Sequence, residues 1–172
     1  VAVGVVISEK RKIAGIVISI VNVLYTIPSI ALLGVLISVT GIGNKTAIIA
    51  LTLYALLPVV RSTYTGIVNI DEKIVEASEA MGSTKFQTMY KVKLPLAFPV
   101  IFSAIRNMVT MTIALAGIAS FVGAGGLGVA IYRGITTNNA NLLLIGSILI
   151  ALLALVSDGL LGIVQRVTFS KG

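Results

Sequence analysis

Long apolar runs recur along this chain and are separated by short polar stretches. Four of them have the length of a membrane span: residues 13–39, 46–67, 95–118 and 140–164. A helix rises about 1.5 Å per residue, so roughly 20 apolar residues cross a hydrocarbon core of about 30 Å. Residues 1–7 are also apolar, and we expect them to be the tail of a longer helix whose start precedes Val1. The pattern predicts an all-α, polytopic transmembrane helical bundle of about five spans, the first truncated, in a single domain of residues 1–172.

Prolines interrupt two of the predicted spans. Pro28 lies inside the first complete run and Pro58 inside the next. Proline removes a backbone hydrogen bond and clashes with the preceding turn, so we expect a kink or break near residues 25–27. Thr26 or Ser29 is placed to hydrogen-bond the backbone groups that such a break would free.

Residues 70–94 form a polar, amphipathic segment between two apolar runs. The acids at its start suit a helix N-terminus, and the apolar residues that follow recur at helical spacing. Gly82 is expected to end this helix in a left-handed conformation, and Ser83 to cap a second helix over residues 84–90. The Leu-Pro pair at residues 94–95 is expected to stop that helix and open the next span. The segment is therefore predicted to be a helix, a glycine turn and a second helix.

The composition supports lipid as the main solvent of this chain. Hydrophobic residues make up 57% of the sequence and charged residues 11%, whereas soluble domains are about one-quarter charged. The absence of cysteine and histidine from the sequence excludes a thiolate or histidine metal site and a histidine-based catalytic triad. No pair of carboxylates lies within the predicted spans either, so we expect no cofactor and no enzymatic site.

The positive charge is predicted to gather on one side of the membrane. The formal net charge is +7. Nine of the thirteen lysines and arginines fall in the turn at residues 8–12, the 70–94 segment or the C-terminal tail: Lys10, Arg11, Lys12, Lys73, Lys85, Lys91, Lys93, Arg166 and Lys171. Such residues collect in the cytoplasmic loops of membrane proteins. We therefore expect residues 70–94 to be cytoplasmic, and the charge needs no nucleic-acid partner.

The residues alone leave two interpretations of the 70–94 segment: a docking element for a soluble partner, or a loop that rests on lipid headgroups. Its motif favours the first. Residues 76–78, Glu-Ala-Ser, are followed after three residues by Gly82, and after nine more by Val92 and the Leu-Pro pair at 94–95. This spacing resembles the Glu-Ala-Ala (EAA) signature of permease subunits of bacterial ABC importers. Serine and valine replace the alanine and isoleucine of that signature.

The resemblance implies a type I ABC importer permease in the bacterial cell membrane. In that family the cytoplasmic segment forms coupling helices that dock into a separate ATPase subunit, where ATP is hydrolysed. The residues that the resemblance assigns to this contact are Glu76, Ala77, Ser78, Gly82, Lys85 and Phe86. It also implies a second permease subunit, identical or related, and an extracytoplasmic substrate-binding protein that delivers the solute.

Other stretches resemble the osmoprotectant branch of these permeases, whose importers carry glycine betaine, carnitine or choline. They are residues 25–29, 55–58, 61–66 and 121–128. The glycine-rich run 123–128 is no phosphate loop, because the Lys-Ser/Thr pair of such a loop does not follow it. The alternatives are an importer for another solute, such as an amino acid or a bile salt, and a self-sufficient secondary transporter. The latter would require intramembrane acids for ion coupling, and Asp158 is the one clear example in the sequence.

Three ionisable residues lie within the predicted spans: Arg61, Arg106 and Asp158. Such residues are costly in a membrane and are usually paired or functional. Arg61 and Asp158 lie at similar depths from the cytoplasmic ends of their helices, which permits an ion pair, and Arg106 is the competing partner. We expect a static pair that holds helices together. A gate element and snorkelling of Arg61 to the headgroups are the alternatives.

Uncharged polar residues within the spans are candidates for lining a pathway. They are Asn22, Thr26, Ser29, Asn107, Thr110 and Thr112. Small residues on the same spans suit close helix packing in lipid, so a packing role for the polar set remains the alternative.

Overall fold

The computed structural model describes residues 1–169, apart from the side chains of Arg11, Lys12 and Phe169. Three of the basic side chains counted above, those of Arg11, Lys12 and Lys171, therefore lie outside the description. Every regular element in the described chain is helical: α1 (Ala2–Glu9), α2 (Arg11–Thr26), α3 (Ser29–Thr40), α4 (Asn44–Val68), α5 (Glu72–Ala80), α6 (Lys85–Gln87), the π-helix η1 (Thr88–Lys93), α7 (Leu94–Ala116), the 3-10 helix η2 (Ile118–Val122), α8 (Gly128–Thr136) and α9 (Ala140–Phe169).

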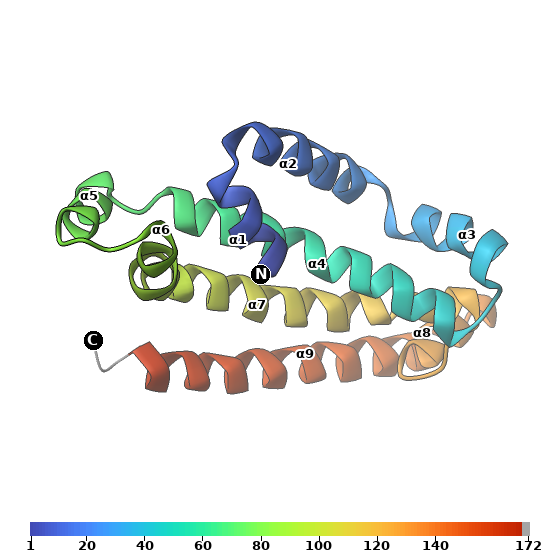
Figure 1. Ribbon diagram of the computed structural model, residues 1–172. Helices are drawn as coiled ribbons and strands as arrows, with labels where there is room; N and C mark the ends of the chain where they lie inside the picture. Colours follow the sequence, from blue (N-terminus) through green and yellow to red (C-terminus); the bar gives the residue numbers. More distant parts are fainter. Residues whose placement is uncertain (170–172) are drawn as a thin grey trace.

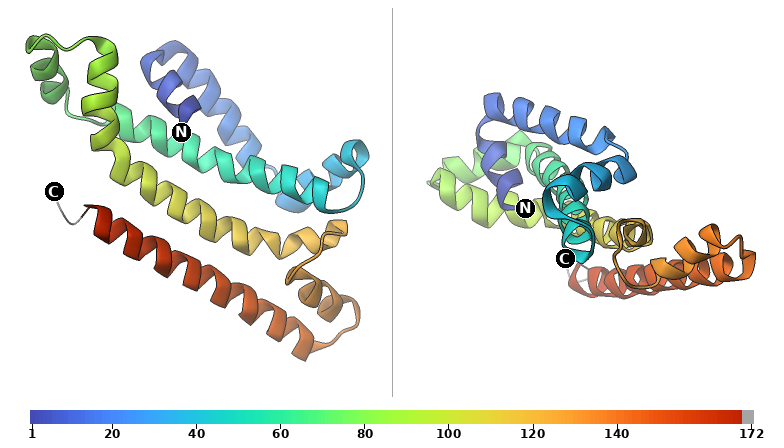
Figure 2. Two further views of the ribbon diagram at one scale, coloured as in Figure 1. Left: turned by 60° about the horizontal axis from the view of Figure 1, so that its bottom comes forward. Right: turned by 90° about the vertical axis from the view of Figure 1, so that its right-hand side faces the viewer.

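Three long helices, α4, α7 and α9, lie side by side with α7 in the middle, each antiparallel to the next (Figure 1). Figure 2 shows the same row from two further sides. The three helices are long and apolar enough to cross a membrane, with 25, 32 and 29 residues when the second is counted from Lys85 and the third to Thr168. The predicted all-α bundle is confirmed. α4 also runs unbroken through Pro58, where an interruption was expected.

The expected number of spans is only approximate. In the described part of the chain, α2 and α3 add at most one further, broken span, because they meet at an angle of 96°. The helix preceding them, α1, has eight residues. The described residues therefore hold three candidate spans, or four if the bent pair counts as one, where about five were expected with the first truncated.

The break between α2 and α3 lies where Pro28 predicts it, but it is sharper than a kink. Ile27 has an extended backbone (φ −67°, ψ 125°), which is the conformation that a following proline favours. The carbonyl of Ile27 accepts a hydrogen bond from the hydroxyl of Tyr54 on α4. The Ile27 amide bonds the Leu24 carbonyl, which leaves the Val23 carbonyl without its usual helical partner, and the Thr26 hydroxyl donates to it. Thr26, as expected, and a tyrosine from another helix therefore both satisfy backbone carbonyls at the break.

The two ends of the bundle carry different structures. α5, α6 and η1 lie beyond one end of the row, the end at which α9 finishes, and α8 and the α3–α4 turn lie at the other (Figure 1). The glycine-rich run is tied to that turn, because the Gly43 amide donates to the Val122 carbonyl (2.8 Å) and the Gly125 amide to the Asn44 side chain (3.2 Å). The 70–94 segment and the glycine-rich run thus lie at opposite ends of the row.

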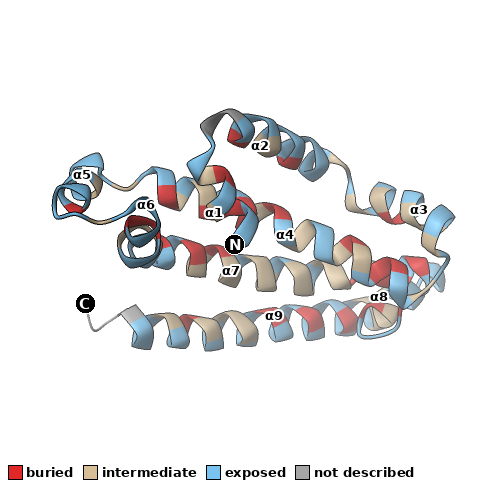
Figure 3. Ribbon diagram, in the orientation of Figure 1, coloured by how far each residue is buried: buried red, intermediate tan, exposed pale blue. Residues whose placement is uncertain are grey.

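Apolar side chains cover much of the outside of the bundle, as expected for a protein in lipid. Figure 3 shows that α9 carries mostly exposed and intermediate residues along its length. Leu155 on this helix is 67% exposed, and its neighbour Val156 is 58% exposed. The buried clusters are small and lie where α1, α2, α3 and α7 contact α4.

Candidate functional site

The 70–94 segment folds as two short arms joined at Gly82. The first arm, α5, begins at Asp71, whose carboxylate accepts a hydrogen bond from the Lys73 amide (3.0 Å). Gly82 has φ +87°, a left-handed conformation that residues with a side chain rarely adopt. The Ser83 amide then donates back to the Ser78 carbonyl (3.2 Å). The predicted glycine turn is confirmed.

The second arm differs from the prediction at both ends. Thr84, rather than Ser83, caps it: its hydroxyl accepts from the Gln87 amide (3.3 Å), and the Gln87 side chain accepts from the Thr84 amide (2.9 Å). The arm also does not stop before residue 94. It continues through η1 directly into α7, because Pro95 falls in the first turn of α7 and the π-helical turn absorbs the change of register.

The residues predicted to contact an ATPase separate into two groups. Five of the six are exposed: Glu76, Ala77, Gly82, Lys85 and Phe86. Ser78 is 3% exposed, and its hydroxyl lies 3.4 Å from that of Thr88, which is 2% exposed. Ser78 therefore lies between the two arms and cannot offer its side chain to a docked partner as the arms stand.

The tip of the two arms exposes two large apolar side chains. Phe86, one of the expected contact residues, is 69% exposed, and Met81, which was not among them, is 82% exposed. The ring of Phe86 stacks on that of Tyr90, with centroids 4.4 Å apart. Large apolar side chains that project from a polar segment into water are typical of a surface that another protein covers.

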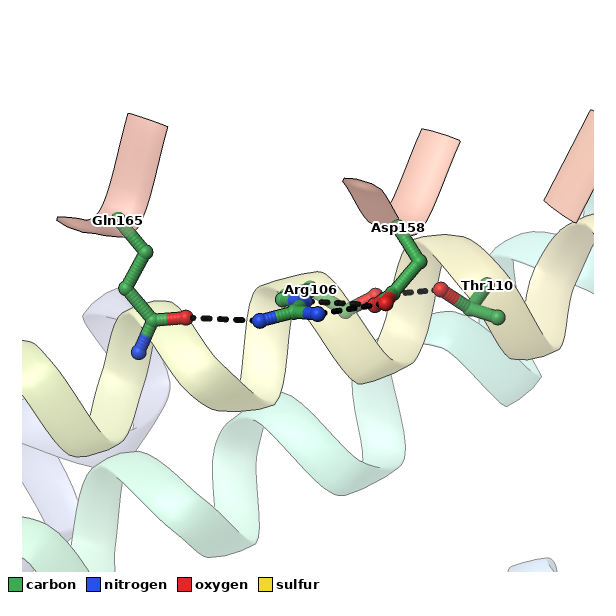
Figure 4. Close-up of polar contacts among 4 residues, drawn as sticks. All are labelled: Arg106, Thr110, Asp158 and Gln165. Carbon is green, nitrogen blue, oxygen red and sulfur yellow. Dashed lines mark hydrogen bonds and ion pairs between the residues drawn. The ribbon is translucent and has the colours of Figure 1, made fainter. Parts of the chain in front are cut away.

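Within the membrane, Asp158 pairs with Arg106 and not with Arg61. The Arg106 Nε and Nη2 atoms donate to the two carboxylate oxygens of Asp158, at 2.6 and 2.5 Å (Figure 4). Arg106 Nη1 also reaches the Gln165 side chain (3.4 Å), and the Thr110 hydroxyl donates to the Arg106 carbonyl (3.1 Å). The Arg61–Asp158 pair is wrong because α7 lies between α4 and α9, so that Arg106 is the nearer arginine.

The pathway candidates are brought together only in part. Asn22, Arg61 and Asn107 line one cavity of about 260 Å³ between α2, α4 and α7. Ser29 lines a separate and much smaller hollow with Tyr54, and the hydroxyls of Thr26 and Thr110 bond to backbone carbonyls of their own helices. Thr112 is half-buried and lines neither space.

A row of membrane-spanning helices, an amphipathic cavity among them and a two-armed segment outside them define a membrane transport subunit. Residues 1–169 match the family described as "Binding-protein-dependent transport system inner membrane component", and the chain belongs to this family. The expected membership of the ABC importer permeases is thereby confirmed.

Two curated permeases and one solved structure illustrate the similarity. The chain is 46% identical over 164 residues to the carnitine transport permease protein OpuCD of Listeria monocytogenes serotype 1/2a (strain 10403S), covering 95% of this chain and 74% of the relative. It is 44% identical, again over 164 residues, to the glycine betaine/carnitine/choline transport system permease protein OpuCD of Bacillus subtilis (strain 168), covering 95% and 72%. A structure of the MetNI methionine ABC transporter in inward-facing conformations matches with a TM-score of 0.82 and 30% identity, over 92% of this chain and 76% of that one.

Proposed function

We propose that this chain is the permease subunit of an ATP-driven importer for quaternary-amine osmoprotectants, namely glycine betaine, carnitine or choline, in a bacterial cell membrane. The observation that carries the proposal is the identity of 44–46%, across 95% of the chain, to permeases named for those solutes. The similarity to a methionine transporter is weaker in identity, at 30%, and supports the fold more than the solute.

The two-armed segment is the proposed docking site for a separate ATPase subunit. It lies outside the row of spans, its Gly82 turn is exposed, and Met81 and Phe86 project from it. The second arm is continuous with α7 through residues 85–116, so a push on the arm is transmitted directly to a membrane span. Glu76, Ala77 and Lys85 would lie at the same contact.

Two further partners complete the proposed assembly. The family is described as binding-protein-dependent, which supports an extracytoplasmic binding protein that delivers the solute to the end of the bundle carrying α8. The apolar outer faces of the helices offer room for a second permease subunit as well as for lipid. The Arg106–Asp158 pair is assigned to helix packing between α7 and α9.

The test is solute uptake by proteoliposomes that contain the permease assembly, its ATPase and its binding protein. We expect uptake of one or more of carnitine, glycine betaine and choline, and loss of uptake when the ATPase is inactive. Uptake that persists without the ATPase would identify a secondary transporter. ATP-driven uptake of methionine alone would keep the class of machine and overturn the proposed solute.

A further inference from the structure

The cavity between α2, α4 and α7 is built from one face of each helix. Its polar members come from all three: Asn22 and Tyr25 from α2, Arg61 and Ser62 from α4, and Asn107 from α7. Its volume of about 260 Å³ is far more than the roughly 10–15 Å³ that one water requires by the same measure. The cavity is therefore large enough for a small organic solute, and its lining is amphipathic because Val21, Leu57 and Met111 complete it.

Arg61 is the unusual member of this lining. It lies seven residues before the end of α4, which places it about 10 Å inside the helix. Its side chain is exposed, and among the described side chains it has neither an acidic partner nor a hydrogen-bond acceptor. Arg106 in α7, by contrast, is matched by Asp158. A guanidinium in a span without a counter-ion is costly, so an anionic group or water is needed at this position.

A second copy of this chain has no free carboxylate to offer Arg61 within its spans. The sequence contains six acidic residues: Glu9, Asp71, Glu72, Glu76, Glu79 and Asp158. Of these, only Asp158 lies in a membrane-spanning helix, and Arg106 already holds both of its oxygens. An identical subunit is therefore not expected to supply the counter-ion, which leaves water or an anionic ligand.

Arginine prefers a planar carboxylate, to which it donates two parallel hydrogen bonds. The amides of Asn22 and Asn107, which line the same cavity, add neutral donors and acceptors. Tyr25 adds an aromatic ring to the lining, and Tyr54, outside the lining, lies beside it with ring centroids 6.3 Å apart at 63°. Aromatic faces attract quaternary ammonium groups. The cavity thus has a carboxylate-binding end and a wall suited to a permanent cation.

We infer that this cavity is a solute site for zwitterions, with the carboxylate on Arg61 and the quaternary ammonium against Tyr25. The inference rests on the proposed function and narrows it: glycine betaine and carnitine fit the site, whereas choline lacks the carboxylate and meets an uncompensated cation at Arg61. Selection for a carboxylate therefore occurs within the permease, in addition to any selection by a binding protein.

The test uses the purified permease–ATPase complex without its binding protein, so that only sites on the complex are measured. The unfolding temperature is recorded with glycine betaine, carnitine or choline at increasing concentration. We expect the two carboxylated solutes to stabilise the wild type and choline to have little effect. Arg61→Gln should weaken the apparent affinity for the carboxylated solutes by about ten- to a hundred-fold, the range given by the loss of a charged hydrogen bond. Arg61→Lys should retain part of it.

Matched variants distinguish the loss of solute binding at this cavity from a general loss of folding. Arg133→Gln removes an arginine from α8, outside the cavity, and should leave the solute response unchanged. Tyr25→Phe keeps the aromatic face and should bind as the wild type does, whereas Tyr25→Leu should not. These variants keep the inference testable if Arg61→Gln does not fold.

The outcomes separate the inference from the proposed function. Equal stabilisation by choline, or carboxylated solutes bound equally well by Arg61→Gln, overturns the inference, and so does the absence of any stabilisation of the wild type. If Arg61 binds a lipid phosphate instead, anionic lipid should stabilise the wild type more than Arg61→Gln while the carboxylated solutes stabilise neither, which also contradicts the inference. ATP-driven uptake by the complete wild-type assembly, measured in parallel, tests the proposed function alone.

Discussion

Arg106 on α7 holds both carboxylate oxygens of Asp158 on α9, and Gly162, one turn further along α9, leaves room for the guanidinium. A Cβ atom at Gly162 would lie 3.1 Å from Cζ and from both terminal nitrogens of Arg106. Figure 4 shows the guanidinium reaching towards Asp158 on one side and Gln165 on the other. One face of α9 therefore presents a carboxylate, a gap and an amide to a single arginine. Through these hydrogen bonds Arg106 joins α7 to α9.

The first prediction concerns the ion pair itself. Asp158→Asn should lower the unfolding temperature in detergent, because it leaves Arg106 charged within a span without its carboxylate. The double variant Arg106→Met/Asp158→Leu should recover most of the loss, since neither charge then remains. A double-mutant cycle measures the coupling, and strictly additive losses would contradict the pair as a unit.

The second prediction uses two glycines of the same helix. Gly162→Ala should lower stability, because the added methyl group would lie 3.1 Å from the Arg106 guanidinium, which must then shift against its two hydrogen bonds to Asp158. Gly159→Ala meets nothing within 4 Å and should raise stability by roughly 0.5–1 kcal/mol, the gain from replacing glycine in a helix. Thermal unfolding of both variants in one detergent gives the comparison. A similar gain in both would mean that the gap at Gly162 is not used.

The third prediction concerns the turn between the two arms. Gly82→Val should uncouple ATP hydrolysis from uptake while the protein still inserts, because φ +87° costs a residue with a side chain about 1–2 kcal/mol. Gly82→Asn is the matched control, since asparagine tolerates this conformation better. The measurements are ATPase stimulation, uptake and co-purification with the ATPase. Full uptake by Gly82→Val at wild-type yield would refute the assigned role of the turn.

The fourth prediction tests the contact between the arms. Thr88→Val should cost roughly 1–3 kcal/mol, because it leaves the Ser78 hydroxyl buried without its partner. Adding Ser78→Ala should restore most of that loss, since the unsatisfied hydroxyl is removed and the EAA signature itself has alanine there. Chemical denaturation in detergent checks both variants. If the double variant is as unstable as Thr88→Val alone, the hydroxyl contact does not join the arms.

The spans and the glycine turn could be predicted from the sequence because their signals are local. The apolar runs at residues 46–67, 95–118 and 140–164 correspond to α4, α7 and α9, whose bounds differ by a few residues. The left-handed Gly82 also follows from its position after a helical pattern. In both cases neighbouring residues in the sequence carry the information.

The features that were mispredicted depend on contacts between distant residues. The choice between Arg61 and Arg106 as the partner of Asp158 requires knowing that α7 lies next to α9. The 96° angle after Thr26 is associated with a bond from Tyr54, 27 residues beyond its acceptor Ile27. The burial of Ser78 likewise depends on a contact with Thr88 of the second arm, which the spacing of the motif does not show. Depth within a helix and motif position do not contain this information.

The most direct test of the account is thiol cross-linking from the two-armed segment, because the sequence contains no native cysteine. Met81→Cys, at a position that is 82% exposed, is compared with Ser78→Cys, at one that is 3% exposed. We predict that the cysteine at 81 cross-links to the ATPase subunit in an ATP-dependent manner, that the one at 78 does not, and that neither reacts with an impermeant reagent added outside the cell. Two results would contradict the assignment of this segment as the contact with the ATPase. One is labelling of position 81 from outside the cell, and the other is ATP-driven uptake without a cross-link between position 81 and any tested position of the ATPase.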